Sequence, residues 1–197
     1  MSLKLRRVDL HHVRTMVGLA DGPWTVEDLR RGLVESGWMR PGEGLAWTPG
    51  ETLEIDGGWE LELGAVPPGP RSFVVLPFAL LWPPLDADGQ DDDLDDEEED
   101  EEEDDLDEDY SEDWERLPDA GPAEFAAEFS RVRALVEGLI GPPASVHGDL
   151  AQGVRWDVWK RGATVFTLYA LDDVPSYSHY DRLALGVWNA EGWTPPE

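Results

Sequence analysis

The chain has 197 residues, a length that fits one domain, and a formal net charge of −29 at pH 7. It has no cysteine, which excludes disulfides and thiolate metal sites, and no apolar stretch of about 18 residues that could cross a membrane. No apolar segment follows the basic N-terminal residues, so the sequence predicts no signal peptide and a cytoplasmic location.

Most of the negative charge lies in one segment. Asp86 to Glu115 contains 22 of the 44 acids and no base, and the other 167 residues have a net charge of only −7. Like-charge repulsion and the scarcity of apolar residues predict a disordered insertion over 86–115 between two halves of one domain, 1–85 and 116–197. Such a field attracts basic proteins and repels nucleic acid and anionic membranes.

Two helices are predicted near the N-terminus. The first runs from Leu10 to about Ala20, with Asp9 as its cap and its inward face formed by Val13, Met16 and Val17. The second begins after Thr25, which stands three residues before Asp28 as in a capping box, and ends at Gly37.

Strand-like runs follow from Gly44 onward. They cover 45–47, 52–55, 59–63 and 73–82, and they are separated by Pro-Gly and Gly-Gly pairs. In the run 59–63, Trp59, Leu61 and Leu63 alternate with two glutamates, which is typical of a strand with one buried face.

The second half begins with a helix that Pro122 opens. Its apolar stripe recurs at helical spacing and consists of Phe125, Phe129, Val132, Val136 and Leu139. Three strands follow, at 154–160, 163–171 and 182–188. This order predicts an α+β fold, with an antiparallel sheet of six or seven strands and helices mainly on one face.

The sequence carries no recognisable catalytic motif. It lacks a glycine-rich phosphate loop, a His-Glu-x-x-His pair and a nucleophile elbow, so we expect no enzyme, no cofactor and no metal site. The alternative is an enzyme that uses His179, in the polar cluster 177–181 with Asp181, or the pair Asp172-Asp173.

Ten tryptophans are more than one core of this size usually holds. A two-residue turn at Arg161-Gly162 gives the hairpin one apolar face, with Trp156 and Tyr169, and one mixed face. We interpret the mixed face as a partner-binding surface, and the alternative is that a helix covers it. The candidate binding residues are Arg155, Asp157, Trp159, Phe166 and Trp188, with Tyr110 and Trp114 of the acidic segment.

Two groups of residues carry a family resemblance. The first is Gly-Pro-Trp-Thr-Val-Glu-Asp-Leu at 22–29 followed by Ser-Gly-Trp at 36–38, and the second is Leu-Ile-Gly-Pro-Pro at 139–143 with Val-Arg-Trp at 154–156. Together they resemble small acidic bacterial proteins that are encoded beside polymorphic toxins and regarded as their immunity partners. The long acidic insertion departs from that pattern, and no residue roles carry over.

The leading hypothesis is therefore a non-enzymatic immunity protein that neutralises a basic toxin. The first alternative is a nucleic-acid mimic or chaperone whose acidic segment masks a basic protein surface. The second is the enzyme described above.

Overall fold

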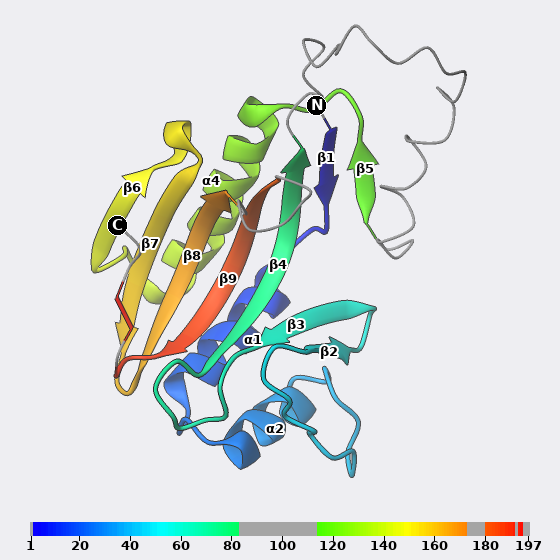
Figure 1. Ribbon diagram of the computed structural model, residues 1–197, viewed down its shortest axis with the longest axis vertical. Coiled ribbons are helices and arrows are strands. Elements are labelled where there is room, and N and C mark those ends of the chain that lie inside the picture. Colours follow the sequence, from blue (N-terminus) through cyan, green and yellow to red (C-terminus); the bar gives the residue numbers. More distant parts are fainter. Residues whose placement is uncertain (1, 83–113, 173–179, 192, 195–197) are drawn as a thin grey trace, which may run out of the picture.

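The computed structural model describes residues 2–82, 114–172, 180–191 and 193–194 (Figure 1). In this part of the chain, nine strands form one antiparallel sheet in the order β2-β3-β4-β9-β8-β7-β6, and β1 pairs with β4 and with β5. The prediction of an α+β fold with an antiparallel sheet is confirmed, and the sheet has more strands than expected.

Both N-terminal helices begin where their caps predict. Helix α1 spans Leu10–Asp21, and Asp9 accepts hydrogen bonds from the amides of His11 (2.8 Å) and His12 (3.1 Å). Helix α2 spans Val26–Glu35, and the Thr25 hydroxyl accepts from the Asp28 amide. The predicted inward residues Val13, Met16 and Val17 are all buried.

Strands β2 (Thr52–Ile55), β3 (Trp59–Leu63) and β4 (Phe73–Trp82) lie where the sequence predicts strands. The run 45–47 forms no strand, and Trp47 instead donates from Nε1 to the carbonyl of Gly64 (2.9 Å). Strands β1 (Ser2–Leu5), β5 (Glu115–Leu117) and β6 (Ser145–Asp149) were not predicted. β5 has only three residues, and the one apolar residue of β6, Val146, is exposed, so neither strand carries an alternating apolar pattern.

Helix α4 spans Pro122–Ile140, with proline in its first turn as predicted. Four residues of the predicted stripe are buried, whereas Leu139, in the last turn, is 37% exposed. The short 3-10 turn η1 (Leu150–Gln152) then leads from β6 into the long strands β7 (Val154–Arg161), β8 (Thr164–Asp172) and β9 (Asp181–Asn189).

The β7–β8 hairpin turns at Gly162-Ala163, one residue later than predicted. Arg161 lies opposite Thr164, and Lys160 lies opposite Val165 instead of Ala163. This changes the pairing by two residues along β8, so every side chain stays on its predicted face of the hairpin.

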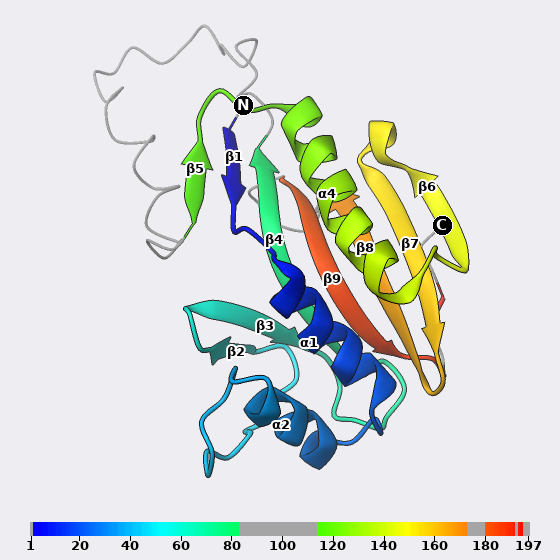
Figure 2. The same ribbon diagram turned by 180° about the vertical axis from the view of Figure 1, so that it is seen from behind.

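The helices α1 and α4 lie on the same face of the sheet (Figure 2). They enclose the main core, which includes Phe129 and Val136 of α4 with Trp159 and Phe166 of the hairpin. A second apolar cluster lies on the opposite face and includes Trp156 and Tyr169. We call this opposite face the helix-free face, because the described helices lie on the other side (Figure 1).

Strands from both sides of the acidic insertion share this sheet. β4 pairs with β9 over most of its length, and β1 pairs with β5. None of the described helices is long and apolar enough to span a membrane.

The buried stripe of α4 gives a prediction about stability. Phe129→Ala should lower the free energy of unfolding by about 2–4 kcal/mol and Val136→Ala by about 1–3 kcal/mol, because both side chains are buried against the sheet. Leu139→Ala, on the same helix but partly exposed, is the matched control and should cost less than either. Urea denaturation measures all three. Losses below about 0.5 kcal/mol at both buried sites would contradict the packing of α4 on the sheet.

Candidate protein-binding surface

The hairpin face that carries Trp159 and Phe166 is not a surface. Trp159 is 3% exposed and Phe166 is fully buried, and both belong to the core that α4 covers. The Trp159 Nε1 donates to the carbonyl of Gly141 at 2.8 Å, so its polar atom is also satisfied inside the protein. The expectation that this face is open to a partner is therefore wrong, and the alternative of a covering helix is observed.

Asp157 and Arg155, also proposed to bind a partner, take part in an internal charge cluster. The Asp157 carboxylate is fully buried between Arg155 Nε, 2.9 Å from Oδ1, and Arg133 Nε of α4, 2.7 Å from Oδ2. The Arg155 guanidinium also lies 5.2 Å from the centre of the Phe129 ring. Because a buried carboxylate is costly unless it is neutralised, these contacts fix α4 on β7.

Trp188 lies on the helix-free face, on the side of the sheet opposite Trp159. Its ring is half-buried and lies 4.8 Å from that of Phe73, and its Nε1 donates to the Thr167 hydroxyl at 2.8 Å. A Cβ atom at Gly186 would lie 2.4 Å from the Trp188 Nε1. Glycine at 186 therefore leaves the space in which this indole lies over the strand.

Trp188, predicted to bind a partner, lies in an aromatic cluster with Trp156 and Tyr169 of the predicted apolar face of the hairpin. Trp156 and Tyr169 stack with ring centres 4.1 Å apart and planes 9° apart, and Trp188 lies 6.0 Å from Trp156 and 6.2 Å from Tyr169. Trp193 packs on the same cluster, 6.3 Å from Trp156. The buried Trp156 Nε1 has no hydrogen-bond acceptor in the described part of the chain.

A glutamate and an arginine border this cluster. Arg182 Nη1 lies 2.8 Å from Glu62 Oε1, and Arg182 Nη2 donates to the Tyr169 hydroxyl at 3.4 Å. The same guanidinium lies 5.8 Å from the centre of the Tyr169 ring. The Arg182 guanidinium thus contacts both Tyr169 of the aromatic cluster and the Glu62 carboxylate of β3.

The acidic segment contains two of the aromatic residues that were predicted to bind a partner, Tyr110 and Trp114. Tyr110 lies outside the described residues. Trp114 is half-buried beside Arg6, whose guanidinium is 5.8 Å from the Trp114 ring and 4.6 Å from the Trp59 ring. Arg6 also donates to the carbonyls of Gly57 (2.9 Å) and Gly58 (2.6 Å). Trp114 therefore contacts an arginine of its own chain.

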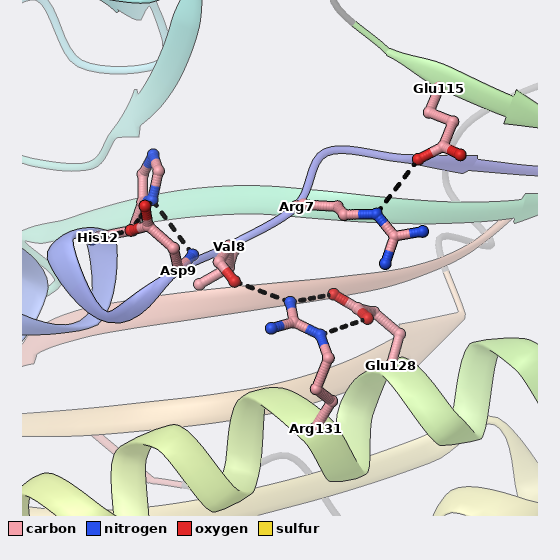
Figure 3. Close-up of polar contacts among 7 residues, drawn as sticks. All are labelled: Arg7, Val8, Asp9, His12, Glu115, Glu128 and Arg131. Carbon is pink, nitrogen blue, oxygen red and sulfur yellow. Dashed lines mark hydrogen bonds and ion pairs between the residues drawn. The ribbon is translucent and has the colours of Figure 1, made fainter.

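A second polar cluster surrounds the junction of β1 and α1 (Figure 3). Arg7 Nε lies 3.3 Å from Glu115 of β5, and Arg131 of α4 pairs with Glu128 while donating to the Val8 carbonyl at 2.7 Å. These contacts connect β1 with the strand that follows the acidic segment and with α4. The pocket beside them has a volume of about 340 Å³ and is lined by Leu5, Arg6, Arg7, His12, Gly57, Trp59 and Glu115. Arg7 and Arg131 thus pair with acids of the protein itself, and Arg6 donates to its backbone carbonyls.

His12 lies in this region and packs on Trp59, with ring centres 4.5 Å apart. Its Nδ1 is 2.7 Å from Asp9 Oδ1. Burial lowers the pKa of His12 below its ordinary value, and the nearby Asp9 only partly opposes this effect. Burial would raise the pKa of Asp9, but hydrogen bonds from His12 and from the His11 amide outweigh it and lower that pKa.

The structure describes only part of the enzyme hypothesis. His179, Tyr177 and Asp173 lie outside the described residues, whereas Asp172 ends β8 directly opposite Asp181 at the start of β9. Within the described ranges, no group of three histidine, aspartate or glutamate side chains is placed to hold a metal ion.

Comparisons of the chain with models of known protein families, with curated proteins and with solved structures found no match.

The lowered pKa of His12 predicts a pH dependence of stability. The unfolded chain takes up a proton near the ordinary histidine pKa of about 6.5, whereas the folded protein resists protonation, so stability falls as pH drops below about 6.5. The contribution of Asp9 is lost only below its ordinary pKa of about 3.8, in a separate window.

Urea denaturation at about pH 8 and about pH 5.5 checks this prediction. His12→Gln should lose less stability between the two values than the natural protein does. His11→Gln removes an imidazole from the same turn and serves as the control. Equal losses in the natural protein and in His12→Gln would show that His12 does not resist protonation.

Proposed function

We propose that this protein binds and neutralises a basic protein. The observation that carries the proposal is how the chain uses its positive charges. Of its 15 basic residues, at least eight form ion pairs with acids in the described part of the chain: Arg7, Arg30, Arg31, Arg131, Arg133, Arg155, Arg161 and Arg182. The acids outnumber the bases by 29, so the surface field is strongly negative and attracts cationic proteins.

The partner we propose is a basic toxin domain encoded beside the gene for this protein. The resemblance of the segments 22–38 and 139–156 to immunity-type proteins supports this choice. Charge is suited to such a task, because opposite fields speed the encounter with a toxin that must be captured before it acts.

In this proposal the acidic segment speeds association with the partner, and contacts made by the folded domain keep dissociation slow. A variant that replaces the acids of 86–113 by asparagine and glutamine keeps the length of the segment and removes its charge. With the toxin domain as partner, its association rate should fall by about tenfold or more while the dissociation rate stays nearly unchanged. Stopped-flow mixing of the two proteins measures both rates.

Two outcomes would contradict this division of roles. If the neutralised variant no longer binds, the acidic segment is itself the ligand, and the mimic or chaperone hypothesis replaces the immunity function. If the toxin domain binds neither variant, the proposed partner is wrong. A scrambled segment of unchanged composition is the control, and it should associate as fast as the natural protein.

A further inference from the structure

We propose that the helix-free face is the docking surface for the partner and that it receives arginine or lysine side chains of a basic protein. This inference rests on the proposed function and adds the place and chemistry of the contact. The surface has two parts. The aromatic centre consists of the half-buried Phe73, Trp188 and Trp193, with Trp156 and Tyr169 buried against them, and the glutamate wing consists of Glu54, Glu60 and Glu62.

The strand register places both parts on one face. In an antiparallel sheet, residues directly opposite each other point to the same side. One such row runs across seven strands, through Thr52, Glu62, Val75, Gly186, Thr167, Val158 and Ser145. Glu60 lies two residues from this row on β3, and Trp188 lies two residues from it on β9. The wing and the centre therefore lie on the same face of the sheet, although the β2–β3 hairpin twists away from the long strands (Figure 1).

The glutamate wing contains an arrangement that the fold does not need. Glu54 lies directly opposite Glu60, and both side chains are exposed. Like charges in opposite positions destabilise a pair of strands. Neither glutamate forms an ion pair with any base in the described part of the chain, whereas the neighbouring Glu62 does. A cationic partner would relieve this repulsion on binding.

Arg182 shows how a guanidinium is held on this surface. It combines an ion pair with Glu62 at 2.8 Å with a position 5.8 Å from the centre of the Tyr169 ring. A partner with several arginines would meet exposed carboxylates at Glu54 and Glu60 and, further along the same face, the half-buried rings of Phe73 and Trp188. Cations bind favourably over such rings, and tryptophan most strongly.

The aromatic centre also has the composition of a binding hot spot. Tryptophan and tyrosine dominate the energetics of protein interfaces, especially where the rings are already ordered. Here Trp188 is held by its hydrogen bond to Thr167, and the stack of Trp156 on Tyr169 lies next to it. Little side-chain freedom is lost on binding, because the rings are already fixed.

A deca-arginine peptide is the probe, titrated into the full-length protein in about 0.15 M salt, where long-range attraction is screened. The indole N–H signals of the tryptophans, observed by NMR, report the contact and the affinity. We expect the signals of Trp188 and Trp193 to move. We also expect Trp188→Ala and Glu60→Gln each to weaken binding by about threefold to tenfold.

The controls separate this surface from general charge. Glu35→Gln makes the same charge change on α2 and should have less than about twofold effect. Because Trp188→Ala could loosen the sheet, Trp188→Phe is measured beside it, and urea midpoints identify any variant that is not folded. If the peptide binds but the Trp188 and Glu60 variants match Glu35→Gln, the docking surface is wrong and the proposed function survives. If the peptide does not bind at all, the proposed function fails as well.

Discussion

The buried carboxylate of Asp157 is the constraint on which the arrangement of the two sheet faces depends. A fully buried anion is tolerated only when cations neutralise it at short range, and Arg155 and Arg133 do so at 2.9 and 2.7 Å. Because Arg133 belongs to α4, the helix must lie over the face of β7 that carries Asp157. That face is consequently core, and the face with Trp156 is left without a helix.

The basic and acidic side chains of the protein also differ in their surroundings. Arginines form ion pairs inside the chain, as Arg161 does with Asp21 and Arg182 with Glu62, while Glu54 and Glu60 remain exposed together. The result is a negative surface that does not depend on the acidic insertion alone. In the function that we propose, charge acts at a distance on a basic partner and the aromatic residues act at contact.

The starts of the helices could be predicted from the sequence, whereas the face of the β7–β8 hairpin that a helix covers could not. The caps Asp9 and Thr25 and the proline at 122 gave correct helix starts, because capping depends on neighbours within a few residues. The hairpin has aromatic residues on both faces, Trp156 on one and Trp159 on the other, so alternation alone could not decide which is covered. The deciding residue, Arg133, lies in another element, and its contact with Asp157 is formed only by tertiary packing. In the same way, the residues around Trp114 in the sequence do not indicate its contact with Arg6, which tertiary packing forms.

A double-mutant cycle on Arg133 and Asp157 tests the central claim most directly, with urea denaturation of Arg133→Ala, Asp157→Ala and the double variant. Asp157→Ala should cost about 1–3 kcal/mol, because Arg155 loses its carboxylate partner, whereas Arg133 keeps its ion pair with Glu137 at 3.1 Å. The double variant should lose at least about 1 kcal/mol less than the sum of the single losses, because the two side chains interact directly. Losses that add to within about 0.3 kcal/mol would contradict the account, since α4 would then be held on the sheet without this charge cluster.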